Sequence, residues 1–444
     1  MKINASLTSR LLTTLAVVGI AVAPLTSCKK KEGCTDPSAV NYDPDADNDD
    51  GTCVYASTTP TTVINGQTYH ILSGTITSSR TLGPDKRWLL SGGVFVNSGV
   101  VLTIDAGTMI YAADDGTTPF LSVQRGGRIN AVGSPSAPIV FTTIKTITGG
   151  AAPGAWGGIV LNGYAQINIC GGGGCTAEGE GGSGTYGGSD DSDNSGVMKY
   201  VRVEYAGKIL GTDNELNGFS FNGVGSGTVL EHLQAYKGSD DGFEFFGGTA
   251  TLKWALSTGN SDDSFDWSHG WRGKGQFWAV HQDAASCDRG FECDNWETDF
   301  MVQPFSNPIL SNFTIVAADD GTASEAVRLR HGTRGSLYNG LVAGAGAGSG
   351  IRVSDSSSTW MDQGLLICRN TTAYGFATNW NGCDPFANDA TNSATDPGVL
   401  TGYVGTDNAN AVDPTTLDSW FSPATFKGAV PAGDDWTAGW TLPL

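Results

Sequence analysis

Basic residues are scarce in this sequence, which has 25 Lys and Arg against 45 Asp and Glu and a formal charge of -20. Because an acidic surface repels phosphate, this composition excludes a protein that binds nucleic acid through backbone contacts. Histidine is also scarce, with five residues, and no cysteine pair has the CxxC spacing of zinc or redox sites. No segment between the short apolar runs has the periodicity and length of a helix. Glycine is abundant, with 63 residues beside 39% apolar residues, which is typical of a turn-rich β protein.

Residues 1–27 have the pattern of a bacterial export signal. Two basic residues precede an apolar run at 11–25, which is shorter than the roughly 20 residues that a membrane span needs. The segment ends in LTSC at 25–28, which resembles the lipobox of bacterial lipoproteins. The resemblance implies that Cys28 is acylated, so we expect an extracytoplasmic protein, lipid-anchored at the outer membrane or cell surface. An ordinary secretory signal followed by an unrelated cysteine is the alternative.

The other eight cysteines form four close pairs along the chain. In an exported protein such pairs favour disulfides that each close a local loop, although the sequence does not fix their connectivity. We therefore predict bonds within the pairs Cys34 and Cys53, Cys170 and Cys175, Cys287 and Cys293, and Cys368 and Cys383.

An acidic module lies between the first two of these cysteines, in the predicted segment 28–60 that also holds the anchor and a linker. Acids alternate in the run DPDADNDDG at 43–51, which can place several carboxylates on one concave loop suited to calcium. The run resembles the DxDxD loops of thrombospondin type 3 repeats, but it lacks the glycine position and closing glutamate of an EF-hand. We predict calcium ligands at Asp43, Asp45, Asp47 and Asp49. A solvated acidic turn is the alternative.

Short strands recur from about residue 88 to 375 and end in glycine or asparagine turns. Equivalent strands begin at 218, 242, 264, 290, 326 and 350, with steps of 24, 22, 26, 36 and 24 residues. A period in the low twenties indicates one coil of a parallel β-solenoid, whereas propeller blades need about 40 to 50 residues. We predict an all-β, right-handed parallel β-helix of pectin-lyase type over 61–375, with loop insertions, and an irregular C-terminal cap over 376–444. A sandwich or propeller is the alternative.

Strand alternation predicts a column of outward side chains on these coils. The apolar residues of each Phe-x-Phe strand point inward, so the residue between them points outward. This column consists of Ser220, Glu244, Asp266, Glu292, Arg328 and Arg352. Acid pairs at 240–241 and 262–263 precede two of the strands, and Asp288 precedes a third. Adjacent carboxylates about 4.8 Å apart repel by roughly 1 to 3.5 kcal/mol. We therefore expect a raised pKa, a bound cation, or basic neighbours such as Arg289, Arg328 and Lys274.

Aromatic residues near this column suggest a carbohydrate ligand. Indole rings can stack on sugar faces while acids and arginines bind hydroxyl groups, and a long oligosaccharide would fit along a solenoid. The predicted glycan-binding residues are Glu292, Trp267, Trp271, Trp296, His269 and Arg352. The alternative is that the tryptophans pack in the core and the histidines satisfy loop hydrogen bonds.

An enzyme is the second functional hypothesis. The acid pairs 22 residues apart, with His331-Gly332 after two arginines, resemble the layout of polygalacturonase-type hydrolases, but the Asn-Thr-Asp and Arg-x-Lys motifs are missing. Inverting hydrolysis needs a protonated and an ionised carboxyl about 6.5 to 9.5 Å apart. Calcium-dependent elimination is equally compatible with the pattern. The candidate catalytic residues are Asp241, Glu244, Asp263, Asp266 and Arg328.

Three runs carry a closer resemblance, to a family of β-helix lipoproteins from Bacteroidota and other marine bacteria. They are SDDGFEFFGG at 239–248, DDSFDW at 262–267 with RGKGQF at 272–277, and DWTAGWT at 435–441. This resemblance implies the fold and the location but no reaction, and the acids in these runs could instead order turns. We therefore expect a membrane-anchored protein that binds calcium and an extended polysaccharide as an adhesin or scaffold. The alternative is a polysaccharide hydrolase or lyase.

Overall fold

The computed structural model describes residues 30–37, 39–53, 59–171, 173–212, 214–283, 287–318, 325–344, 346–399 and 408–443. The chain divides into two compact units between residues 58 and 59. Within the described ranges, no helix is both long and apolar enough to cross a bilayer. The predicted signal at 1–27 and the predicted lipidation of Cys28 lie outside the described residues.

The small unit is a disulfide-closed loop. Its two short strands, β1 (Glu32–Gly33) and β2 (Asn48–Asp49), pair in parallel. Cys34 and Cys53 are bonded across it, which confirms the first predicted disulfide.

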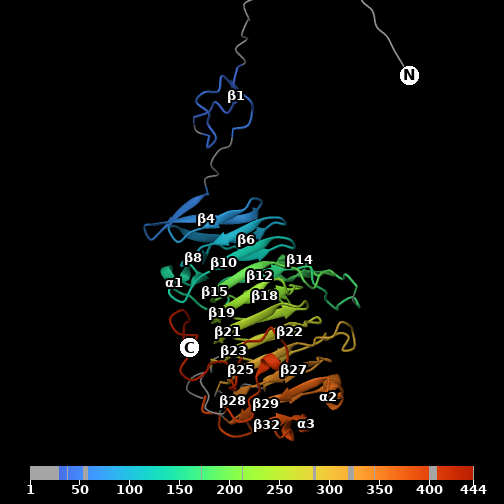
Figure 1. Ribbon diagram of the computed structural model, residues 1–444. Helices are drawn as coiled ribbons and strands as arrows, with labels where there is room; N and C mark the ends of the chain where they lie inside the picture. The colour runs from blue at the N-terminus through green and yellow to red at the C-terminus, as the bar shows by residue number, and fades with distance from the viewer. Residues whose placement is uncertain are drawn as a thin grey trace, which may run out of the picture. The chain divides into compact units, whose positions relative to one another are not determined.

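The large unit is a parallel β-helix, which confirms the predicted fold class. In Figure 1 its coils stack from β4 (Gln67–Ile76) toward β32 (Thr378–Asn381). Strand β3 (Thr61–Ile64) forms an antiparallel pair with β4 at the start. Equivalent strands of successive coils pair in parallel and form three faces.

One face, which we call the ladder face, carries the predicted column. After the second half of β6 (Arg87–Val96), its strands are β9 (Phe120–Val123), β12 (Ile159–Asn162), β18 (Phe219–Asn222), β20 (Phe243–Phe246), β22 (Phe265–Ser268), β24 (Phe291–Cys293), β26 (Glu325–Leu329), β29 (Ser349–Val353) and β32.

The other two faces share five long strands. These strands are β15 (Gly196–Glu204), β19 (Val229–Tyr236), β21 (Thr251–Thr258), β23 (Lys274–His281) and β25 (Ile309–Val316). The second face is completed by β5 (Arg80–Leu82), β7 (Val101–Ile104), β10 (Arg128–Val132), β27 (Gly335–Tyr338) and β30 (Leu366–Arg369). The third is completed by β8 (Met109–Ala112), β11 (Ile139–Thr143), β28 (Leu341–Ala343) and β31 (Thr372–Tyr374).

Two hairpins and three short helices lie outside these faces. The hairpins are β13 (Ala177–Gly179) with β14 (Gly184–Tyr186), and β16 (Ile209–Gly211) with β17 (Asn214–Glu215). The helices are α1 (Lys145–Thr148), α2 (Asp355–Asp362) and α3 (Asp384–Ala387), and the 3-10 turns are Glu180–Gly182 and Pro414–Thr416.

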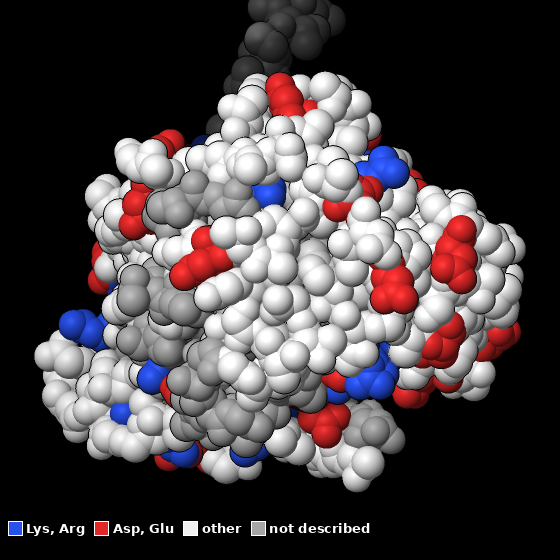
Figure 2. Space-filling view, turned by 90° about the horizontal axis from the view of Figure 1, so that it is seen from below, with Lys and Arg blue, Asp and Glu red and all other residues white. Residues whose placement is uncertain are grey.

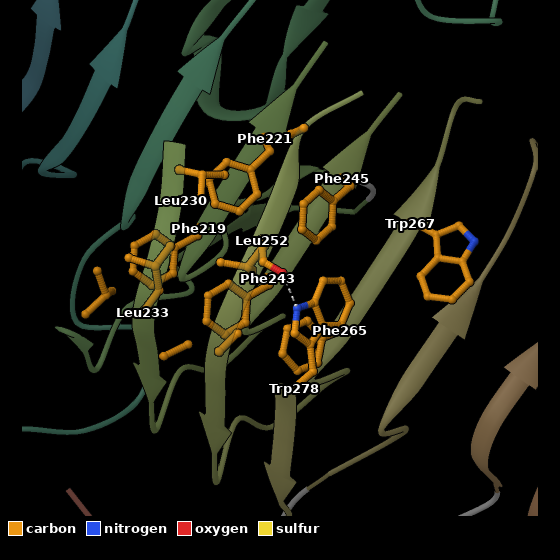
Figure 3. Close-up of a cluster of buried hydrophobic side chains, with 14 of the residues drawn as sticks. Phe219, Phe221, Leu230, Leu233, Phe243, Phe245, Leu252, Phe265, Trp267 and Trp278 are labelled. Carbon is orange, nitrogen blue, oxygen red and sulfur yellow. Dashed lines mark hydrogen bonds between the residues drawn. The ribbon is translucent and has the colours of Figure 1, made fainter. Parts of the chain in front are cut away.

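Stacked aromatic rings fill the interior behind the ladder face (Figure 3). Phe219, Phe243 and Phe265 are fully buried, with ring centroids 5.0 and 4.8 Å apart. This spacing matches the distance between hydrogen-bonded strands, so each coil contributes one ring to a continuous stack. The stack fixes the register of the coils, because a slip by one residue would turn the rings outward and the acids inward.

The C-terminal segment agrees with the predicted cap only in its first part, where Phe386 of α3 packs into the core beside β30 and β32. Residues 408–443 instead run from the last coil back along the outside of earlier coils, and Trp440 and Leu442 contact β15 and β19. Side chains from seven successive coils donate hydrogen bonds to carbonyl oxygens of this segment. The donors are Arg202, Gln234, Lys253, Gln276, Asn312, Asn339 and Asn370. The segment therefore acts as a strap that joins the coils.

Charge is unevenly distributed over the β-helix. The end that carries β32 and α3 shows acidic side chains in separate places between many uncharged ones (Figure 2). The ladder face instead gathers ten carboxyl groups in one hollow, which is described next.

Candidate functional site

The outward column has the predicted register. Glu244 pairs with Ser220 above it and Asp266 below it, and the column continues through Glu292, Arg328 and Arg352. The inward neighbours Phe243, Phe265 and Phe291 have no exposed surface. The ladder face therefore presents three acids and then two arginines at successive steps of one strand spacing.

A hollow of about 330 Å³ opens over these acids, and we call it the acidic hollow. Its lining comes from the column, from the turns that precede β20, β22 and β24, and from the two inserted hairpins. The lining residues are Glu180, Glu215, Asn217, Asp240, Asp241, Glu244, Asp262, Asp263, Asp266, Asp288, Arg289, Glu292 and Arg330. Ten carboxyl groups thus face two guanidinium groups.

The buried acids of the turns connect one coil to the next. Asp241 Oδ1 accepts a hydrogen bond of 2.9 Å from the backbone N–H of Asp263, and Asp263 Oδ1 accepts one of 2.6 Å from that of Arg289. Asn217 Oδ1 does the same for Asp241, at 3.2 Å. One oxygen of each acid therefore holds the stack together, which is a structural role beside any functional one.

Burial and mutual repulsion raise the pKa of the acids in the hollow. Burial and the Asp262 carboxylate raise the pKa of Asp240 to about 7, and burial and Asp240 raise that of Glu180 to about 8. The pKa values of Asp241, Glu244 and Asp266 lie well above the usual range, for burial first and then for neighbouring carboxylates. The hollow therefore opposes full ionisation unless a cation enters.

Three acids at the centre form no ion pair within the described residues, and we call them the open acids: Asp241, Glu244 and Asp266. One oxygen of each lies within 4.8 Å of the others. Glu244 accepts a hydrogen bond from the Asn217 amide. Asp266 Oδ1 is buried and, among the residues described, has no hydrogen-bond partner.

Further along the same face the acids are paired, and we call Glu292, Asp294 and Glu325 the paired acids. Glu292 contacts Arg289 at 2.6 Å and Arg330 at 2.7 Å. Asp294 contacts Arg330 at 3.0 Å and His331 at 2.9 Å. Glu325 contacts Arg352 at 2.6 Å, Arg328 at 3.2 Å and Arg289 at 3.4 Å.

The arginines outweigh the effect of burial on the pKa of Glu325 but not on that of Glu292. Burial raises the pKa of Glu325, but the Arg352 hydrogen bond and the charge of Arg328 outweigh it and leave the pKa lowered. Burial and Asp294 still raise the pKa of Glu292 to about 7 despite its two guanidinium neighbours. The hydrogen bond to Asp294 raises the pKa of His331.

The predicted aromatic binding residues need correction. Trp267 and Trp271 have no exposed surface, because their strand position and turn direct them into the core, and Trp278 packs there too (Figure 3). Their indole N–H groups donate to Thr333 Oγ1, Ala250 O and Leu252 O. None of these three rings can stack on a sugar.

Two further predicted ligand residues lie partly buried. Trp296 remains partly accessible. His269 lies against Phe246, and its Nδ1 is 3.4 Å from the Tyr186 hydroxyl. Burial lowers the pKa of His269 to about 4. The His269 imidazole is therefore neutral at physiological pH, and His269 is not among the residues that line the acidic hollow.

The predicted calcium ligands of the small unit take part in local contacts. Asp43 pairs with Lys31 Nζ at 2.8 Å, Asp45 lies 3.8 Å from it, and Asp47 accepts a hydrogen bond from the Lys31 backbone. Asp49 caps the turn at Gly51. In the described part of the chain, the acidic groups close enough to share a cation belong to the β-helix. Calcium at the small unit stays a prediction.

Two of the four predicted disulfides form. Cys170 is bonded to Cys175, as Cys34 is to Cys53. Cys293 is instead a buried thiol, because its strand position points into the core and away from the loop that holds Cys287. Cys368 and Cys383 are also thiols, and the Cys383 sulfur contacts Ile351 O at 3.4 Å.

Sequence reasoning missed several residues of the hollow. Glu180 and Glu215 come from hairpins whose position no coil spacing predicts. Asn217 could have been found, since it precedes Asp241 by about one coil. Lys274, expected beside the acids, pairs with Asp418 of the strap at 2.6 Å on another face.

Comparison with known proteins gives a family and one structural likeness. A family model described as pectate-lyase like beta helix domain matches residues 74–441. Among solved structures, the chain is similar to the Dettilon tailspike protein (gp208), with 12% identity, a TM-score of 0.24 and coverage of 82% of this chain. The chain spans 61% of that tailspike chain. No curated protein matches the sequence.

Proposed function

Because this chain belongs to the family of pectate-lyase-like β-helix domains, we propose that its acidic hollow binds calcium and, through calcium, an extended acidic polysaccharide. The observation that carries this proposal is the group of open acids, whose oxygens lie within 4.8 Å of one another. Asp266 Oδ1 supports it, since it is buried without a hydrogen-bond partner in the described chain.

The chemistry of the lining favours a hard cation. The open acids and their neighbours offer oxygen ligands only, and calcium takes six to eight oxygens in flexible geometry. Three carboxylates leave coordination positions for groups of a ligand. A divalent ion would also offset the repulsion among the ten carboxyl groups of the hollow.

The shape and charge of the ladder face support the proposal of a polysaccharide ligand. An anionic sugar cannot approach ten bare carboxylates, but it can complete the coordination of a bound cation. Arg328 and Arg352 continue the same column and present guanidinium groups that suit carboxylate or sulfate. The ligand would therefore lie along the axis of the β-helix.

The proposal includes an adhesive or scaffolding role at a membrane. The signal-like segment 1–27 and the lipobox-like run at 25–28 support an acylated Cys28, and thus an outer-membrane or cell-surface location. Residues 43–51 would supply a second calcium site. Acyl-chain labelling of the expressed chain, compared with Cys28→Ala, tests the anchor.

Catalysis is the alternative function. A general acid must stay protonated near neutral pH, and burial raises the pKa of Asp241 and Asp263 in this direction. Hydrolysis or elimination would release reducing ends or unsaturated products from a polysaccharide. If the protein is an enzyme, Asp263→Asn would abolish that release. If it only binds the polysaccharide, neither the original chain nor the variant would release products.

Calorimetric titration with calcium tests the proposal. We expect Asp266→Asn to weaken binding at the hollow by roughly tenfold or more, because it removes one charged ligand. Asp45→Asn identifies any contribution of the small unit, and Asp434→Asn, at an exposed position, is the charge-matched control. Unchanged calcium affinity in Asp266→Asn would overturn the proposal.

A further inference from the structure

A second hollow, of about 310 Å³, opens on the turns that precede β9, β12 and β18, and we call it the lysine hollow. Its charged lining groups are Lys145, Lys208 and Asp114. Gly150, Gly154 and Ala152 line it beside them, so its floor is formed largely by backbone and small side chains. Such a floor leaves room for a ligand to reach both ammonium groups.

The lining of the lysine hollow has a net positive charge. Lys145 Nζ pairs with Asp114 Oδ1 at 3.0 Å, and the Asp114 side chain is 58% exposed, so water weakens this pair. Lys208 forms no ion pair with any described residue. In a chain with a formal charge of -20, a half-buried lysine without a counter-ion is a candidate anion ligand.

Hydrogen bonds connect the loops that line the two hollows. Ser239, one residue before Asp240 of the acidic hollow, donates its hydroxyl hydrogen to Gly207 O beside Lys208. The backbone N–H groups of Ser239 and Gly154 both donate to Ala206 O, at 3.0 and 2.9 Å. Lys208 lies one coil before Glu244 and Lys145 lies two coils before it, which corresponds to about 5 to 10 Å along the axis.

We propose that the lysine hollow is an anion subsite that binds a carboxylate or sulfate group of a glycan directly, without a cation. This inference rests on the proposed function for the identity of the ligand as a polysaccharide. One acidic group would bind Lys145 and Lys208 while a neighbouring group of the same chain reaches the cation at the open acids. The two hollows would thus bind acidic groups at two positions along one polymer.

The test measures oligosaccharide binding to the full mature chain by calorimetry, with calcium and with EDTA. The probes are an oligouronate, a sulfated oligosaccharide of similar length and a neutral one, so that the source of the anion is identified. The variant is Lys145→Ala with Lys208→Ala. The charge-matched control is Lys86→Ala together with Lys30→Ala, whose lysines are exposed and outside both hollows.

We expect the variant to bind the preferred acidic probe roughly tenfold or more weakly than the control chain does, since two charge-assisted contacts are lost. Calcium affinity and melting temperature should stay unchanged. Equal binding of the acidic probe to the variant and control chains would overturn the subsite, as would tight binding of the neutral probe. Lysine-dependent binding that persists in EDTA, with no calcium binding, would overturn the proposed function alone.

Discussion

The open acids and the paired acids lie on the same face of the same scaffold, yet they differ in how their charge is compensated. Asp241, Glu244 and Asp266 have no ion pair in the described chain, whereas Glu292, Asp294 and Glu325 share four arginines. Both groups rest on the same inward stack of rings. A β-helix therefore forces acids into register, and the residues of the next coils decide whether a protein group or an external ion neutralises them.

Removing Arg289 should have the largest effect on this comparison. Arg289 contacts Asp263, Glu292 and Glu325, so Arg289→Ala leaves the buried Asp263 carboxylate without an ion pair in the described chain and removes one arginine contact from each of the other two acids. We expect a loss of about 3 to 5 kcal/mol in the free energy of unfolding, measured by urea denaturation in EDTA. Calcium should restore part of this loss, because the substitution leaves carboxylates that a cation can bind in place of the guanidinium group.

The matched control for that variant is Arg369→Ala. Its pair with Asp389 is more exposed, with 56% of the Arg369 side chain accessible, so its loss should cost at most about 1 kcal/mol. Equal effects of the two variants would contradict the role given to Arg289.

Raising the pH in EDTA should have the next largest effect. The folded protein holds the pKa of Glu180 at about 8 and that of Asp240 at about 7, above their unfolded values near 4. Between these values the folded state binds more protons than the unfolded state, so stability falls as pH rises from about 4 to about 8. We expect the free energy of unfolding to fall by more than about 2 kcal/mol over this pH range.

Calcium tests whether ionisation of the acids in the hollow causes that loss. A cation that binds the ionised hollow should largely abolish the decline, because it binds only the folded state. The measurement is the melting temperature at several pH values with and without calcium. A pH profile that calcium leaves unchanged would contradict this explanation.

A pair of conservative variants should show smaller effects of opposite sign. In EDTA at pH 8, Glu244→Gln removes a charge from the open acids and keeps an oxygen that accepts from Asn217. We therefore expect a gain of about 1 kcal/mol in the free energy of unfolding. Glu292→Gln instead removes one carboxylate contact from each of Arg289 and Arg330, so we expect a loss of about 1 to 2 kcal/mol in the free energy of unfolding. Changes of the same sign in the free energy of unfolding of the two variants would contradict the distinction between the open and the paired acids.

The coil spacing predicted the ladder face residue by residue. Phe243, Phe265 and Phe291 point inward and Glu244, Asp266 and Glu292 outward, because alternation in a strand leaves two directions only. The tryptophans were misplaced for a related reason. Trp267 occupies the inward position of its own strand, so alternation itself argues for the core, whereas composition suggested a sugar-binding surface.

Contacts between distant segments could not be predicted in this way. The strap at 408–443 returns to coils that precede it by as many as 238 residues, as the bond from Arg202 to Trp440 O shows. Cys293 has a cysteine six residues before it in the sequence, yet its side chain is directed into the core. Proximity in the sequence does not specify the direction in which a segment runs or a side chain points. That direction determines both the position of the strap and the burial of Cys293.

The repeat, the inward rings and the outward column follow from the amino-acid sequence, since a regular strand repeat converts spacing into position. The folded chain adds what this spacing does not contain: two hairpins bring Glu180 and Glu215 into the acidic hollow, four arginines compensate the paired acids, and the open acids have no ion pair in the described chain. Charge compensation depends on distances across several coils and inserted loops, and periodicity carries no information about these distances.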